Sequence, residues 1–82
     1  MKYSVMHGGT SDEWMIDECD TLRDAIESEA RYIERTRFEL PGYVYVCTET
    51  DDGIEVMDGT WINLDAGDNG AKAHELRGLL NA

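Results

Sequence analysis

Basic residues are scarce in this chain, whose 82 residues include 7 Lys and Arg against 18 Asp and Glu, for a formal net charge of −11. A chain this negative repels phosphate groups, so direct binding to DNA or RNA is disfavoured. The same charge attracts cationic partners and speeds encounter with them. The composition therefore favours a protein partner with a positive surface.

Long apolar runs and cysteines are also few. The longest apolar run is residues 43–47, whereas a membrane-spanning helix needs about 20 apolar residues, so we expect no membrane association. No apolar block typical of a signal peptide follows Met1, and the cytoplasm is the expected compartment. Two cysteines, Cys19 and Cys47, are too few for a disulfide scaffold, and we expect both to pack as small apolar residues.

Residue patterns typical of catalysis, metal binding or cofactor binding are lacking as well. His7 and His74 are isolated, and no short-spaced Cys or His pair favours zinc. Residues 65–70 resemble a calcium loop, but a glycine occupies the third position, where a ligand is needed. We therefore expect no catalytic residue, no metal and no cofactor, and a protein that is not an enzyme.

The length and a hydrophobic content of 41% fit a single compact domain over residues 1–82. A helix is predicted from Thr21 to about Phe38, because apolar residues recur there at helical spacing: Leu22, Ile26, Ala30 and Ile33. Thr21 and Asp24 resemble a capping box at its start. A second, short helix is expected over residues 71–80, capped by Asp68 or Asn69.

Alternating side chains predict strands over residues 2–7, 43–50, 54–57 and 60–64. Residues 13–19 fit a strand paired with the first, and a helical turn is the alternative. Asp58-Gly59 is typical of a type I′ hairpin. The expected fold is α+β, an antiparallel sheet of four to five strands packed against one main helix, with a short C-terminal helix, in the order β-β-α-β-β-β-α.

The turn at residues 51–53 decides which side chains share a sheet face. A two-residue loop pairs Asp51 with Ile54 and places three apolar side chains beside Tyr43, Tyr45 and Glu49: Ile54, Val56 and Trp61. A three-residue loop pairs Thr50 with Ile54 and places those three under the helix, with Val44, Val46 and Thr48. Glu49 and Glu55 then share the outer face with Tyr43, Tyr45, Met57 and Ile62. We expect the second register, because it buries no carboxylate.

Acidic residues gather between positions 43 and 70, which hold seven acids and no Lys or Arg: Glu49, Asp51, Asp52, Glu55, Asp58, Asp65 and Asp68. Residues two apart on a strand lie about 6.5–7 Å from each other, so an acidic sheet can imitate a polyanion. Solubility and ordinary turn chemistry are the alternative explanation. We expect these seven acids, with Tyr43 and Tyr45 as apolar anchors, to bind a partner. The N-terminal hairpin, the second helix or a homodimer contact could instead cover the two tyrosines.

The layout of the chain resembles that of small anti-CRISPR proteins of phages and mobile elements. The resemblance lies in the opening strand at residues 1–5, the strand-to-helix segment at residues 16–26 and the acidic hairpin around Asp51-Asp52-Gly53. It implies a non-enzymatic inhibitor, acting in the host-cell cytoplasm, that occupies the basic nucleic-acid-binding surface of a CRISPR effector and blocks DNA or RNA engagement. A phage structural or assembly protein, or an antitoxin-like partner, binding through the aromatic sheet face, is the alternative.

Overall fold

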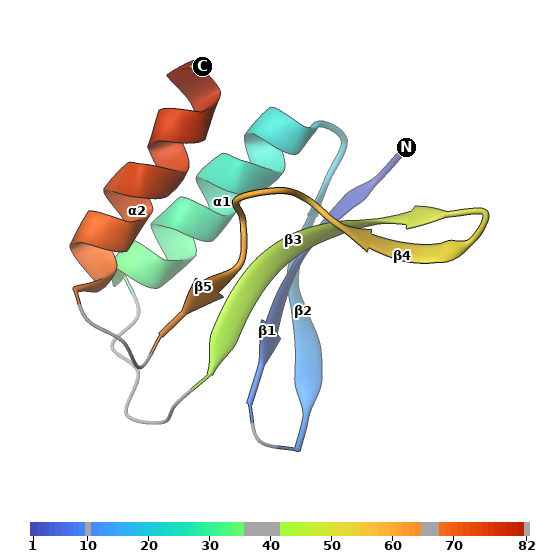
Figure 1. Cartoon of the computed structure of the whole chain (residues 1–82), viewed down its shortest axis with the longest axis horizontal. Coiled ribbons are helices and arrows are strands. Elements are labelled where there is room, and N and C mark those ends of the chain that lie inside the picture. Colours follow the sequence, from blue (N-terminus) through green and yellow to red (C-terminus); the bar gives the residue numbers. More distant parts are fainter. Residues whose placement is uncertain (10, 36–41, 65–67, 82) are drawn as a thin grey trace.

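The structure, a computed structural model, describes residues 1–9, 11–35, 42–64 and 68–81. Within them the elements follow the predicted order (Figure 1): β1 (Tyr3–Gly8), β2 (Glu13–Cys19), α1 (Leu22–Arg35), β3 (Tyr43–Thr50), β4 (Gly53–Val56), β5 (Ile62–Asn63), α2 (Asn69–Gly78) and a 3-10 turn, Leu79–Asn81. The α+β prediction is confirmed, and residues 13–19 form a strand, not a helical turn. The predicted end of the first helix, beyond Arg35, lies outside the described residues.

The sheet is antiparallel, in the order β2-β1-β3-β4, and β5 also pairs with β3. Because β1 occupies one side of β3, the two short strands β4 and β5 share the other side and form an interrupted edge. Thr60 fills the interruption with its buried side chain. Its Oγ1 accepts a hydrogen bond from the Val46 amide at 3.1 Å and donates to the Met57 carbonyl at 2.8 Å.

The type I′ hairpin predicted at Asp58-Gly59 is therefore wrong. A type I′ turn needs positive φ at both central residues, whereas Gly59 has φ +80° and no described non-glycine residue has positive φ. The segment instead makes a turn closed by a hydrogen bond from the Thr60 amide to the Met57 carbonyl at 3.2 Å. This turn connects the two short edge strands, β4 and β5.

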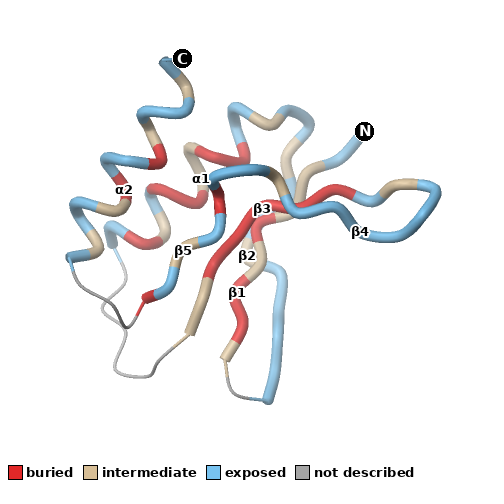
Figure 2. Tube along the Cα trace, in the orientation of Figure 1, coloured by how far each residue is buried: buried red, intermediate tan, exposed pale blue. Residues whose placement is uncertain are grey.

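Both helices lie on one side of the sheet, and the core lies between the helices and the sheet (Figures 1 and 2). The buried core cluster is made by the sheet face turned toward the helices, by the residue after β5 and by both helices: Val5, Val44, Val46, Leu64, Ala25, Ile26, Ala30, Ile33, Ala73 and Leu76. The start of each helix is capped as predicted: Thr21 Oγ1 accepts from the Asp24 amide at 3.1 Å and Asp68 Oδ1 from the Gly70 amide at 2.8 Å.

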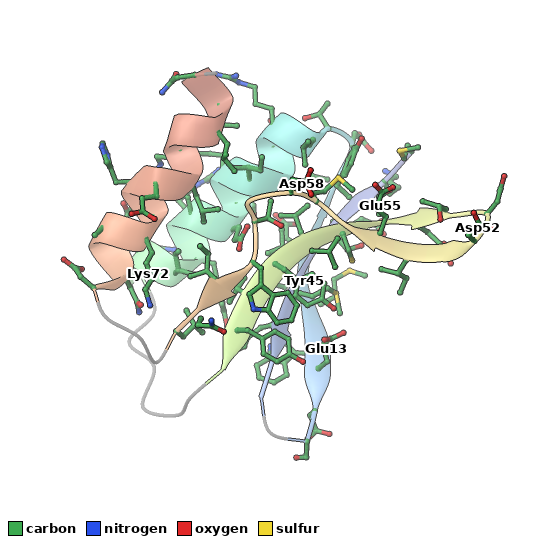
Figure 3. The ribbon with its side chains drawn as sticks, in the orientation of Figure 1. Glu13, Tyr45, Asp52, Glu55, Asp58 and Lys72 are labelled. Carbon is green, nitrogen blue, oxygen red and sulfur yellow. The ribbon has the colours of Figure 1, made fainter. Side chains whose placement is uncertain are left out.

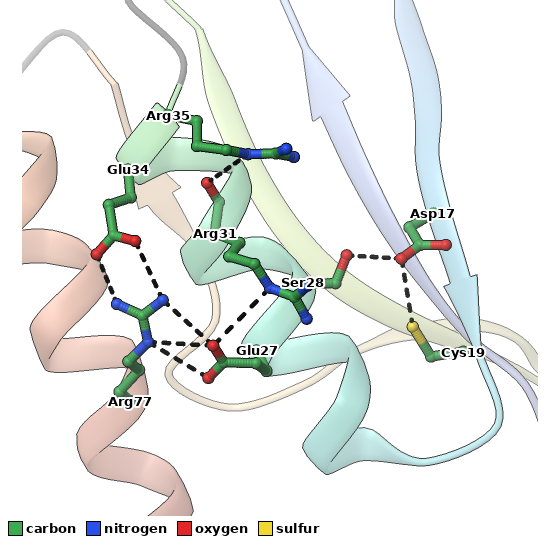
Figure 4. Close-up of polar contacts among 8 residues, drawn as sticks. All are labelled: Asp17, Cys19, Glu27, Ser28, Arg31, Glu34, Arg35 and Arg77. Atoms are coloured by element: carbon green, nitrogen blue, oxygen red, sulfur yellow. Dashed lines mark hydrogen bonds and ion pairs between the residues drawn. The ribbon is translucent and has the colours of Figure 1, made fainter.

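A guanidinium ties the two helices together (Figure 4). Arg77 of α2 forms ion pairs with Glu34 at 2.6 Å and Glu27 at 3.2 Å, both on α1. Glu27 also forms an ion pair with Arg31, one turn further along α1, at 3.9 Å. The helix layer thus uses a large part of the few cations in the chain for its own contacts.

The expected register of the β3–β4 hairpin is wrong by one position. Thr50 pairs with Gly53, so Glu49 lies opposite Ile54 and Thr48 opposite Glu55. Since paired residues in an antiparallel sheet share a face, Ile54 and Val56 lie on the face of Tyr43, Tyr45 and Glu49. Two side chains expected there, Met57 and Ile62, instead pack against the core. Glu49 and Glu55 point to opposite faces, whereas we expected them on the same one.

A bulge in β2 changes a second expected face. Pairing shifts between Val5 and Met6, so that Val5 faces Asp17 and Met6 faces Met15. In a regular strand Asp17 would share a face with Met15. Because of the bulge it lies on the helix side, where it accepts a hydrogen bond from the Ser28 hydroxyl of α1 at 2.7 Å (Figure 4). This hydrogen bond holds the pKa of Asp17 below its usual range.

The core also contains a carboxylic acid. Glu29 is fully buried on α1, and neither of its carboxylate oxygens has a hydrogen-bond partner among the described residues. Burial raises the pKa of Glu29 to about 9, so the group is protonated at neutral pH. Its sequence position signals this burial, since it lies three residues after Ile26 and four before Ile33, on the apolar stripe of α1.

Candidate partner-binding surface

The face of the sheet turned away from the helices, here called the outer face, is covered by neither α1 nor α2 (Figure 1). Strand pairing places these side chains there: Glu13, Met15, Glu18, Met6, Tyr43, Tyr45, Cys47, Glu49, Ile54 and Val56. Several are well exposed for apolar residues, including Ile54 at 72% and Met15 at 52%. An exposed apolar sheet face of this kind is typical of an interaction surface.

Three aromatic rings, here called the aromatic stack, lie together on this face. The Trp61 ring is 4.5 Å from that of Tyr43 and 4.9 Å from that of Tyr45, at interplanar angles of 15° and 12°. Trp61 is 47% exposed, whereas Tyr45 is only 7% exposed. The indole therefore covers the tyrosines and itself presents the accessible aromatic surface.

Glu13 adds a carboxylate to the aromatic stack. Figure 3 shows it beside Tyr45 on the side of the sheet away from the helices. The Tyr43 hydroxyl donates a hydrogen bond to Glu13 Oε2 at 3.2 Å. Burial first, and then Glu13, raise the pKa of both tyrosines. The stack thus combines a flat apolar surface with a fixed negative charge at its hydroxyl edge.

Four of the predicted acids lie at the projecting end of the β3–β4 hairpin, here called the acidic arm: Glu49, Asp51, Asp52 and Glu55. The arm extends past the helices (Figures 1 and 3), and all four acids are exposed. Asp51 and Asp52 form the turn at the tip, and Glu49 and Glu55 flank it on opposite faces. The charge therefore surrounds the tip and does not form a flat acidic face.

None of the ion pairs among the described residues involves the acidic arm. The basic members of those pairs are Lys2, which pairs with Asp20, and two arginines that pair with acids of α1. Asp20 and Glu34 are held by such ion pairs, and Asp17 is held by its hydrogen bond from Ser28. The carboxylates of the arm are available to an external cation.

The remaining predicted site residues do not all gather at the arm. Asp58 lies in the turn between β4 and β5, on the same edge of the molecule (Figure 3). Asp68 is occupied as the cap of α2, and the start of α2 lies far from the β3–β4 hairpin tip in Figure 1. Asp65 lies outside the described residues. Tyr43 and Tyr45 are on the outer face as predicted, but Trp61 covers them.

Trp61 and Glu13 are the residues that sequence reasoning missed. We expected Trp61 to lie under the helix, because that position follows from the three-residue loop. Glu13 was expected in the strand over residues 13–19, paired with the first strand, but no contact was predicted for its side chain. Alternation along the strand places Tyr43 and Tyr45 on one face. Trp61 can be placed on that face from the sequence only when the register of the preceding hairpin is known.

His7 and the two cysteines differ in burial and in the groups they contact. His7 is buried, with Nδ1 2.7 Å from the Tyr32 hydroxyl and its ring 4.5 Å from that of Trp14. Both cysteines are free thiols, Cys47 buried as predicted and Cys19 only half-buried, and burial raises the pKa of each. Such thiols are poor nucleophiles at neutral pH.

The described part of the chain has neither a cluster of metal-binding side chains nor a helix that could span a membrane. No group of three or more His, Cys, Asp or Glu side chains is placed there to hold a metal ion. Neither α1 nor α2 is long and apolar enough to cross a membrane. Comparison of the chain with protein-family models, curated proteins and solved structures gave no match.

Proposed function

We propose that this protein is a non-enzymatic binding protein whose acidic arm occupies a basic, nucleic-acid-binding surface of a host protein complex. The observation that carries the proposal is the unpaired state of Glu49, Asp51, Asp52 and Glu55 among the described residues. Like charges placed this close repel one another and cost stability. A basic surface that normally holds phosphates would relieve that repulsion, and binding there would exclude DNA or RNA.

The projection of the arm supports this mode of binding. Asp51 and Asp52 lie at a two-residue tip, beyond the part of the sheet that the helices cover (Figure 2). A narrow acidic projection can enter a groove lined by Lys and Arg, where its carboxylates form charge-assisted hydrogen bonds. Exposed pairs of this kind are screened by salt, so the affinity should fall as ionic strength rises.

CRISPR effectors are the first class of partner to test, because the chain resembles anti-CRISPR proteins in layout. These complexes hold guide RNA and target DNA in positively charged channels. Action on such a complex would take place in the bacterial cytoplasm, with the protein as a monomer or a homodimer. An antitoxin-like protein that masks a basic toxin would use the same contacts.

Charge reversal tests the proposal. The variant Asp51→Lys/Asp52→Lys/Glu55→Lys should lose its partner in a pull-down from bacterial lysate, with an unchanged circular dichroism spectrum. The control Asp12→Lys/Asp24→Lys/Glu75→Lys changes the net charge by the same amount at exposed acids outside the arm and should keep the partner. Equal capture by both variants would exclude the arm as the binding site.

A second candidate function is a phage structural or assembly protein that binds an apolar partner through the outer face. The exposure of Ile54, Val56 and Trp61 favours it. Binding would then be insensitive to salt, would survive reversal of the arm, and would be lost on Trp61→Ala. Repeating the pull-down at low and high salt separates the two candidates.

A further inference from the structure

We propose that the aromatic stack binds an arginine side chain of the basic partner, with the guanidinium lying flat on the exposed face of Trp61. The inference deepens the proposed function and rests on it, since it assumes that the partner is basic. It assigns to the outer face a role distinct from that of the acidic arm: the arm attracts positive charge, and the stack distinguishes arginine from lysine.

The geometry of the stack leaves one face of the indole open. The rings of Tyr43 and Tyr45 are only 6.0 Å apart. Rings on opposite faces of Trp61 would be separated by two contact distances, about 7 Å or more, so both tyrosines lie against the same face. The 47% exposure of Trp61 therefore belongs mainly to its other face and its edge.

The orientation of the indole is fixed by a contact at its edge and by two on its covered face. Its Nε1 donates a hydrogen bond to the Asn63 Oδ1 atom at 3.3 Å, and both tyrosine rings are nearly parallel to it. A rigid aromatic platform loses little conformational entropy when a ligand binds. Tryptophan is also the best aromatic partner for a cation.

The charge around the stack selects a cation. Three carboxylates share the outer face, those of Glu13, Glu18 and Glu49. Of the described Lys and Arg residues, five lie on the helices, and Lys2 is paired with Asp20. Glu13 already accepts one hydrogen bond from Tyr43, and a carboxylate has further lone pairs for a guanidinium.

Arginine fits this arrangement better than lysine. Its guanidinium is planar and weakly hydrated, stacks on aromatic faces and donates to carboxylates as a fork, whereas the lysine ammonium is a compact, strongly hydrated charge. Tyr45 and Glu49 are four residues apart on β3, about 14 Å along the strand. One basic surface can therefore contact the stack and the acidic arm together.

Two synthetic twelve-residue peptides test the inference, one of alternating Arg and Gly and one of alternating Lys and Gly, titrated into the whole protein at low salt. We expect the arginine peptide to bind about threefold to tenfold more tightly and to quench tryptophan fluorescence. Trp61→Leu should abolish this preference while keeping the affinity for the lysine peptide. The control is Trp14→Leu, which removes an indole that is also half-exposed, at 48%, but lies beside His7.

The outcomes separate the inference from the proposed function. Equal affinity of the wild-type protein for both peptides, or a preference that survives Trp61→Leu, would overturn the arginine site and leave the acidic arm standing. Loss of the preference in Trp14→Leu alone would place the site elsewhere. Binding of both peptides that is unaffected by reversal of the acidic arm would contradict the proposed function itself.

Discussion

Thr50 and Gly53 are direct partners across the β3–β4 hairpin. This pairing leaves two residues, Asp51 and Asp52, as the whole of the tip. It also carries Ile54 and Val56 to the outer face, so that one pairing sets both the shape of the acidic arm and the apolar character of the sheet beside it.

The turn depends on a backbone conformation that glycine adopts readily. Gly53 has φ +126°, and a Cβ built there meets no atom within 4 Å, so Gly53→Ala tests backbone strain alone. We expect a loss of about 1–3 kcal/mol in the free energy of unfolding, measured by urea denaturation. Gly78→Ala on α2, which also has open space around it, is the control and should stabilise slightly. Equal stability of the two variants would show that the hairpin does not have this turn.

Stability should depend on pH through Glu29. Its pKa of about 9 in the folded protein lies above the ordinary value of 4.5, so the folded state holds a proton that the unfolded state releases. The free energy of unfolding should therefore be highest below about pH 4.5 and fall toward about pH 9, by at most about 1.4 kcal/mol per pH unit. Glu29→Gln should remove this slope and be the more stable protein at pH 8.

The control for Glu29 is Glu34→Gln, which removes a carboxylate paired with Arg77. The pKa of Glu34 is lowered, chiefly by its hydrogen bond to Arg77, so its contribution to stability is present above its unfolded pKa and is lost in acid. Glu34→Gln should be slightly less stable than wild type at pH 8. Denaturation curves of Glu29→Gln with the wild-type slope between pH 5 and 9 would contradict a buried, protonated Glu29.

Thr60 should stabilise the interrupted sheet edge. In Thr60→Val the shape is kept, but the Val46 amide loses its acceptor and the Met57 carbonyl loses a donor. An unsatisfied buried group costs about 1–3 kcal/mol, to be measured as a shift in the urea midpoint. Thr50→Val, at a half-exposed position, should cost less than half as much. If both substitutions are equally mild, Thr60 does not bridge the gap.

The helices, strands and their order could be predicted from periodicity, because the apolar stripe of α1 and the alternation in β3 each leave one stable solution. The hairpin register could not. We chose the three-residue loop to avoid burying Glu49, but the end of the hairpin lies beyond the helices and neither of its faces is covered there (Figure 2). The cost of burying a carboxylate therefore does not distinguish the two registers, and the turn at Asp51-Asp52 determines the register.

Two other differences from the expected fold arise from the way the strands pair. By itself the Asp58-Gly59 dipeptide favours a hairpin in which β4 and β5 pair with each other. In the structure both strands pair instead with β3, at different positions along it. The bulge in β2 cannot be detected from alternation, since one extra residue reverses the faces beyond it. Strand pairing thus overrode a local turn signal at Asp58-Gly59 and a regular alternation in β2.

The central claim is that the acidic arm takes the place of nucleic acid on a basic partner. The most direct measurement is competition: a labelled nucleic acid bound to the captured partner, or to a CRISPR effector with its guide RNA, is titrated with this protein and followed by fluorescence anisotropy. We predict displacement that weakens with salt and is lost in Asp51→Lys/Asp52→Lys/Glu55→Lys. A complex in which the partner holds nucleic acid and this protein at the same time would contradict the account.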